Sequence, residues 1–167
     1  MQRYINTIAI LMIALVPAVG RAQSRSVYME QVDCQGGSFG LRLPRRLPEV
    51  MKLGPVKREE VREVEKWEGY TATRKYVYFA GFTLGLVTFS NDPNRYMVSF
   101  AEITDPRWTR VAPFSVGESV DSARGKLGAP AANDPELKAT YGSEGGDISF
   151  QSSGGKITKI TYGCYTG

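Results

Sequence analysis

The sequence predicts an α+β fold of two related modules, each with short helices packed on an antiparallel β-sheet. Two stretches carry this prediction: "FGLRLPRRLPEVMKLGPV" and "FSVGESVDSARGKLGAP" both end as a short helix closed by Leu-Gly and a nearby proline. Each is followed by segments with the alternating pattern of strands. A short helix cannot bury an apolar side alone, so each is expected to lie on its own sheet. We therefore predict an internal duplication, with modules at residues 23–110 and 111–167; the alternative is a chance similarity of two helix ends.

The first 22 residues have the pattern of a signal peptide. Arg3 supplies the positive start, residues 8–19 an apolar stretch, and Gly20-Arg21-Ala22 the small residues before a cleavage site. A membrane anchor is the alternative, but a spanning helix needs roughly 20 apolar residues and this run is shorter. We therefore predict a periplasmic or secreted protein that begins at Gln23 and has no transmembrane segment.

The charge balance argues against nucleic acid as the partner. The chain has 21 basic and 17 acidic residues, and loss of Arg3 and Arg21 leaves 19 against 17, a net charge of +2. The basic residues gather in one region, which is either a solvated helical face or a surface for an acidic protein or the anionic cell envelope. They are Arg42, Arg45, Arg46, Lys52, Lys57 and Arg58.

The chain contains two cysteines, Cys34 near the start of the mature protein and Cys164 near its end. An even number in an exported chain favours a disulfide. The alternative is a pair of free buried thiols. A bridge would require the two ends of the fold to lie side by side.

The first half is predicted to hold a strand at residues 27–32 and two helices. Pro48 opens a short helix that Gly54 ends. A second helix begins at Pro55, where Val61, Val64 and Trp67 repeat at three-residue spacing while the charged residues between them face water.

A β-hairpin follows, formed by "TRKYVYF" and "FTLGLVTFS" around Ala80-Gly81. If these two residues are the whole turn, Phe79 lies opposite Phe82 and Val77 opposite Leu84. The core face then carries Val77, Phe79, Phe82, Leu84 and Leu86, and the other face carries Tyr76, Tyr78, Thr83, Val87 and Phe89. A third strand is expected at residues 96–103.

The second half is predicted to begin with a helix capped by Ser119. Its inward side is Val120, Ala123 and Leu127, and Gly128 ends it. Strands are expected at residues 140–141, in "DISFQ" and in "KITKITYG".

A motif in this second half resembles a known module. It runs Phe114-x-Val116-Gly117-x-Ser119, then Leu127-Gly128-x-Pro130, then "ISF" and "GKITKI". The motif resembles the fold shared by the β-lactamase-inhibitor proteins and the small outer-membrane-assembly lipoproteins, in which a helical pair precedes an antiparallel sheet. The resemblance implies tandem modules, as in the inhibitors. It covers the second module well and the first loosely. The sequence departs from the inhibitors, whose disulfides lie within modules, and from the lipoproteins, which carry a lipidated cysteine.

Catalysis is not expected, because the chain has no histidine. This removes the commonest general base, the Ser-His and Cys-His pairs and most zinc sites. The carboxylates at residues 59–65 are read as a solvated face, and no phosphate-binding glycine loop is present. We predict no catalytic residue, no cofactor and no metal.

A protein-binding role is favoured instead. Tyrosine, tryptophan and arginine dominate protein interfaces, and the predicted partner-binding residues are Tyr76, Tyr78, Phe89, Trp67 and Tyr70. The alternative is that another sheet or the second module covers them. The predicted function is that of an inhibitor or immunity protein acting on an enzyme or effector in the envelope. An envelope-assembly or maintenance factor is the alternative. A third class, a small β-barrel inhibitor of lysozyme, is suggested by "DCQGGSFGLRLP" but disfavoured by the helices expected at residues 48–67.

Overall fold

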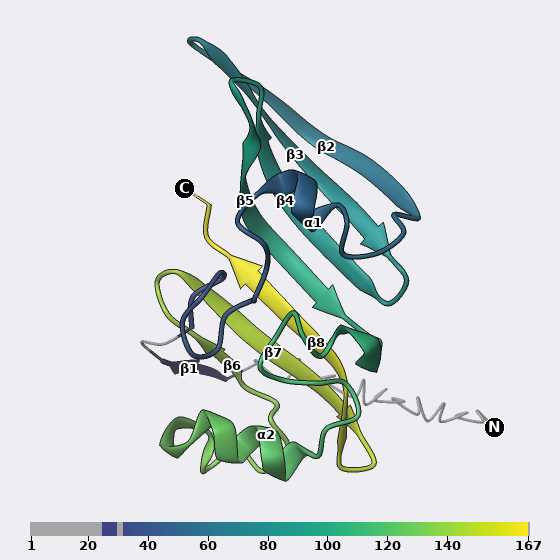
Figure 1. The fold of residues 1–167 in the computed structure, drawn as a ribbon. Helices are drawn as coiled ribbons and strands as arrows, with labels where there is room; N and C mark the ends of the chain where they lie inside the picture. The colour runs from purple at the N-terminus through teal and green to yellow at the C-terminus, as the bar shows by residue number, and fades with distance from the viewer. Residues whose placement is uncertain (1–24, 30–31, 167) are drawn as a thin grey trace, which may run out of the picture.

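The strands of this protein form one mixed β-sheet in the computed structural model, which describes residues 25–29 and 32–166 (Figure 1). The sheet is eight-stranded, in the order β1-β6-β7-β8-β5-β4-β3-β2, and β1 and β6 are parallel while the other pairs are antiparallel. The strands are β1 (Ser26–Tyr28), β2 (Arg58–Trp67), β3 (Tyr70–Phe79), β4 (Phe82–Phe89), β5 (Asp92–Ile103), β6 (Thr140–Gly142), β7 (Gly146–Ser153) and β8 (Lys156–Cys164). The predicted signal peptide, residues 1–22, lies outside the described residues.

The predicted α+β fold of two helix-on-sheet modules is wrong. The described chain holds two short α-helices, α1 (Leu47–Val50) and α2 (Val120–Leu127), and the fold is mainly β. The sheet runs without a break through the middle of the molecule, because β5 pairs with β8 from Phe100 opposite Gly163 to Ile103 opposite Ile160. The boundary near residue 110 stays a prediction, as does the duplication. The first strand, β1, pairs with β6 and so joins the strands of the second half.

The helix predicted from Pro55 onward is also wrong, because these residues form strand β2 on the edge of the sheet. The pairing of β2 with β3 shifts between Val61 and Glu63, which marks a β-bulge. The bulge places Val61 and Val64, opposite Lys75 and Thr73, on the same side of the sheet despite their three-residue spacing. A β-bulge therefore places apolar residues three positions apart on one side of a strand, a spacing that is otherwise typical of a helix. Val61 and Val64 are 58% and 54% exposed, not buried.

The β3–β4 hairpin is confirmed in detail. The turn is Ala80-Gly81, Phe79 lies opposite Phe82, and Val77 lies opposite Leu84. The five residues predicted for the core face are all buried. Helix α2 is confirmed as well: the Ser119 side chain accepts a hydrogen bond from the Ser122 N–H, and Gly128 ends the helix with φ of 71°.

All helices of the described chain lie on one face of the sheet. Val50 of α1 and Leu127 of α2 belong to the same buried cluster as Val77 and Ile160 of the sheet. Figure 1 shows α1 over the β4–β5 part of the sheet and α2 beside the strands of the other half. We call the opposite side, which no described helix covers, the open face. None of these helices is long and apolar enough to cross a membrane, within the residues described.

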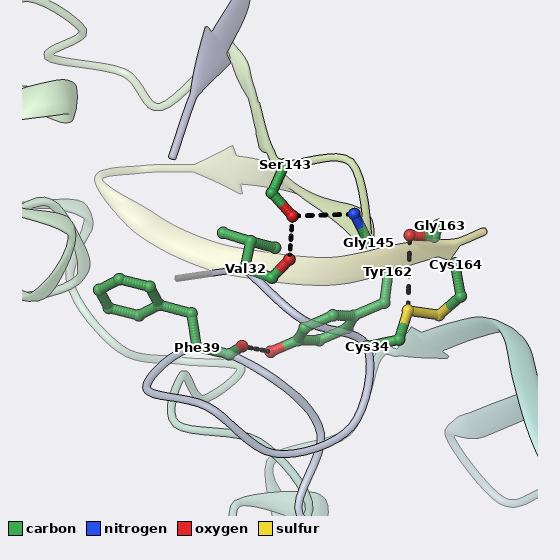
Figure 2. The surroundings of a disulfide bond; sticks show 8 residues. All are labelled: Val32, Cys34, Phe39, Ser143, Gly145, Tyr162, Gly163 and Cys164. Carbon is green, nitrogen blue, oxygen red and sulfur yellow. Dashed lines mark hydrogen bonds between the residues drawn. A yellow bond between two sulfur atoms is a disulfide. The ribbon is translucent and has the colours of Figure 1, made fainter. Parts of the chain in front are cut away.

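The predicted disulfide joins Cys34 to Cys164, with 5.5 Å between the two Cα atoms (Figure 2). Hydrogen bonds hold the surrounding N-terminal segment against the strands. The Tyr162 hydroxyl donates to the Phe39 carbonyl (3.0 Å), and the Ser143 hydroxyl donates to the Val32 carbonyl (2.7 Å). The start and the end of the described fold are therefore tied together.

Candidate partner-binding face

On the open face, one row of residues that lie opposite each other on neighbouring strands runs across the sheet from β2 to β6. From Tyr76 onward, glycines alternate with larger residues along it, each on a different strand. From β2 through β3, β4, β5, β8 and β7 to β6, the row is Glu60, Tyr76, Gly85, Phe100, Gly163, Asp147 and Gly142. We call it the transverse row. Each glycine leaves space above the backbone that a neighbouring side chain can fill.

Gly85 shows why the alternation matters. A Cβ atom at this position would lie 2.9 Å from the Phe100 Cβ and 3.0 Å from the Tyr76 Cε1, closer than such atoms normally approach. Without it, the Tyr76 and Phe100 rings meet edge to face, with centroids 5.8 Å apart. The glycine therefore allows two aromatic rings from β3 and β5 to meet above β4.

Two arginines from β2 lie over the tyrosine rings of β3. The guanidinium carbon of Arg58 is 4.1 Å from the Tyr78 ring centroid, and that of Arg62 is 5.1 Å from the Tyr76 centroid. Glu60 lies between them: it pairs with Arg62 at 2.9 Å and with Arg58 at 3.4 Å, and it accepts a hydrogen bond from the Tyr78 hydroxyl. We call Tyr76, Tyr78, Phe100, Arg58 and Arg62 the aromatic patch.

The other three predicted partner-binding residues form a separate group, the tip cluster, where the β2–β3 and β4–β5 turns meet. Trp67 stacks on Tyr70 with centroids 6.3 Å apart, Tyr70 contacts Phe89 at 6.0 Å, and Arg95 lies 4.4 Å over the Phe89 ring. Trp67 is 57% exposed.

Charged side chains separate the tip cluster from the aromatic patch along β3. Arg74 pairs with Glu63 and Glu65 and donates to the Thr166 hydroxyl near the end of the chain. Val87, predicted for this face, does lie opposite Arg74 but is only 5% exposed and offers no contact surface. The structure thus divides the predicted residues into Tyr76 and Tyr78 in one group and Trp67, Tyr70 and Phe89 in another.

The far half of the open face is polar. Asp147 lies beside a shallow cavity of about 460 Å³ that Ser99, Ser143 and Glu144 also line. Burial raises the pKa of Asp147, against a hydrogen bond from the Gly163 N–H that lowers it. Among the residues that the structure describes, no group of histidine, cysteine, aspartate and glutamate side chains could hold a metal ion.

Sequence reasoning missed three parts of the aromatic patch. Arg58 and Arg62 were assigned to a solvated helix, although their place opposite the tyrosines follows once β2 is a strand. Phe100 was expected in the third strand, but it was not assigned to either face of the sheet. The signal for it was Gly85, an isolated glycine in an otherwise apolar strand, which often marks close approach of another group.

Comparison with protein-family models, with curated proteins and with solved structures finds no match for this chain. The resemblance to the β-lactamase-inhibitor proteins and the assembly lipoproteins therefore stays a prediction from motifs. The function has to be argued from the open face itself.

Proposed function

We propose that this chain is an exported, non-catalytic protein-binding protein, and that it inhibits or neutralises an enzyme or effector in the cell envelope. One observation carries the proposal. Tyr76 and Tyr78, held between Arg58, Arg62 and Phe100, lie partly exposed on a face that no described helix covers.

The chemistry of the aromatic patch suits a protein interface. Tyrosine and arginine are enriched among the residues that contribute most to binding, because they combine a large contact area with directional hydrogen bonds. The patch is partly arranged before binding, since Glu60 bonds to Arg58, Arg62 and Tyr78 and the Tyr76 ring packs on Phe100. Less side-chain freedom is then lost on binding, which favours the complex.

Export is supported by the disulfide, because such bridges persist in oxidising compartments and are rare in the cytosol. The predicted signal peptide agrees with this assignment but lies outside the described residues. An inhibitor or immunity protein is the most concrete class that combines export, a rigid covalently closed fold and a preformed contact face.

The test is capture of a partner from an envelope fraction, with purified mature protein as bait and two matched double variants. Tyr76→Ala/Tyr78→Ala removes two rings from the aromatic patch. Tyr28→Ala/Tyr165→Ala removes two exposed tyrosines that lie outside it, at 67% and 77% exposure. A hot-spot tyrosine contributes about 2 kcal/mol, which is roughly a thirtyfold change in Kd for each ring. We expect this loss in the first variant and no loss in the second.

The captured protein then decides the function. A hydrolase or toxin whose activity falls when the bait is added supports inhibition. An outer-membrane assembly protein that binds without loss of activity would support the assembly-factor alternative. Equal binding by both double variants, with unchanged stability, would refute the aromatic patch as the contact site.

A further inference from the structure

A second concave site lies on the other side of the sheet from the aromatic patch. It is a cavity of about 460 Å³, lined by residues of the loop before α1 and by one residue of β5. The lining residues used below are Gln35, Leu41, Arg42, Leu43, Arg45 and Tyr96. Leu41 and Tyr96 belong to the buried cluster that also contains the residues of α1 and α2, which places the cavity on the helix-covered side.

The lining carries two positive charges and no negative one. Within the described chain neither Arg42 nor Arg45 forms an ion pair, whereas Arg58, Arg62 and Arg74 all do. Burial raises the pKa of the Tyr96 hydroxyl, and the negative charge of Glu49 acts in the same direction. Glu49 is not among the residues that line the cavity. Arg42 and Arg45, both exposed, therefore border one cavity whose lining includes no carboxylate.

The backbone that carries these arginines is anchored on both sides. The Arg42 N–H donates to the Val111 carbonyl at 2.8 Å. The Tyr96 hydroxyl donates to the Pro44 carbonyl and accepts from the Gln35 side chain at 2.8 Å. The backbone at Arg42 and at Pro44, between the two arginines, is thus held in place, which limits the positions that the two side chains can take.

Arg46, the next residue, is held through its side chain instead. Its guanidinium donates twice to the Asn94 side-chain oxygen, at 2.9 and 3.2 Å. One arginine of this basic run therefore has a structural partner, and the two that line the cavity do not.

We infer that this cavity binds an organic phosphate. A phosphate monoester carries a charge close to −2 at neutral pH, which matches two guanidinium groups, and the forked donors of arginine fit its oxygens in pairs. Half-buried Leu43 supplies apolar surface for the rest of the ligand, whereas Leu41 and Tyr96, at 1% and 8% exposure, add little. A soluble phosphate ester and the headgroup of a phospholipid share this chemistry. The site is independent of the proposed protein-binding face.

The experiment titrates phenyl phosphate into the mature, oxidised protein and follows binding by calorimetry. We compare the wild type with Arg42→Gln/Arg45→Gln and with Lys66→Gln/Lys156→Gln, which removes the same charge from exposed positions outside the cavity. We expect saturable binding that weakens at least tenfold in the arginine variant and stays unchanged in the lysine variant. Arg42→Lys/Arg45→Lys, which keeps the charge but not the fork, should bind with intermediate affinity. Absence of saturable binding, or equal weakening in the first two variants, overturns the proposal.

Vesicles distinguish the two sources of phosphate. Co-sedimentation with phosphatidylcholine vesicles containing phosphatidic acid, lost in Arg42→Gln/Arg45→Gln and absent with pure phosphatidylcholine, supports a lipid headgroup. Binding of phenyl phosphate without co-sedimentation supports a soluble ester. The Tyr76→Ala/Tyr78→Ala variant should bind phenyl phosphate normally, so failure of this site and failure of the protein-binding face can be told apart.

Discussion

Removal of the Cys34–Cys164 bridge should lower the free energy of unfolding by about 5 kcal/mol. The bridge spans a sequence separation of 130 residues, and in the chain-entropy model a loop of that length restricts the unfolded chain by about 5 kcal/mol at 25 °C. Domains of this size are stable by about 5–15 kcal/mol in total. Reduction should therefore remove at least a third of the stability, and the reduced protein should unfold at much lower urea concentrations.

The packing around the bridge in the folded protein is consistent with the full loss of about 5 kcal/mol. The Cys34 sulfur lies 3.5 Å from the Gly163 carbonyl oxygen, and a Cβ on Gly146 would approach that sulfur to 3.1 Å. The bridge is thus packed against backbone that holds its place through the β7–β8 pairing.

The assay is urea denaturation of the wild type and of Cys34→Ala/Cys164→Ala, each with and without a thiol reductant. The wild type should lose stability when reduced and then match the variant, while the variant should not respond to reductant. A wild-type midpoint that is the same in both conditions would show that the bridge does not limit the unfolded chain.

Three further predictions concern the core and the open face. Leu127→Ala should cost about 2–5 kcal/mol, because Leu127 is 3% exposed; an unchanged urea midpoint would mean that α2 does not pack on the sheet. Gly85→Val should cost about 1–3 kcal/mol by forcing the Tyr76 and Phe100 rings apart. Gly125→Ala is its control, because no atom beyond its chain neighbours and its own helix backbone lies within 4 Å of the added Cβ, and should raise stability by up to about 1 kcal/mol; equal effects of the two glycine variants would contradict the packing argument. Burial raises the pKa of Asp147 in the folded protein above its value in the unfolded chain. The contribution of Asp147 to stability therefore falls as the pH rises from the unfolded-state pKa to the folded-state pKa. The stability of Asp147→Asn relative to the wild type should therefore increase from pH 4 to pH 7. If the urea midpoints of variant and wild type differ by the same amount at both pH values, the raised pKa is contradicted.

Local signals in the sequence predicted the elements whose structure depends on their neighbours in the chain. The Ala80-Gly81 turn determined the register of the β3–β4 hairpin, and with it the buried face, because side chains alternate strictly on either side of such a turn. Helix α2 was predicted from its cap and its glycine stop. These parts needed no information from distant segments.

The parts that failed depend on distant pairing. Residues 58–67 were read as a helix because a bulge in β2 gives Val61 and Val64 a three-residue spacing, and the bulge exists only in the pairing with β3. The β5–β8 pairing, which turns two expected sheets into one, joins residues about 60 positions apart in the chain. The aromatic patch was half predicted for the same reason: its tyrosines come from the hairpin, and its arginines come from the strand that was misread.

The position of β8 determines when the sheet can be completed. β8 is the last strand in the chain but sits in the middle of the sheet, between β7 and β5. Until residues 156–164 have emerged, β5 has one unpaired edge and β7 has another, and bare edges of this kind pair readily with other chains. Strands β2 to β5 are joined by consecutive hairpin turns and can pair with one another first. Strand β5 gains its second partner only when β8, near the end of the chain, is present. A protein shortened by its last ten residues would therefore lose the join between the two halves of its sheet, and not merely a tail.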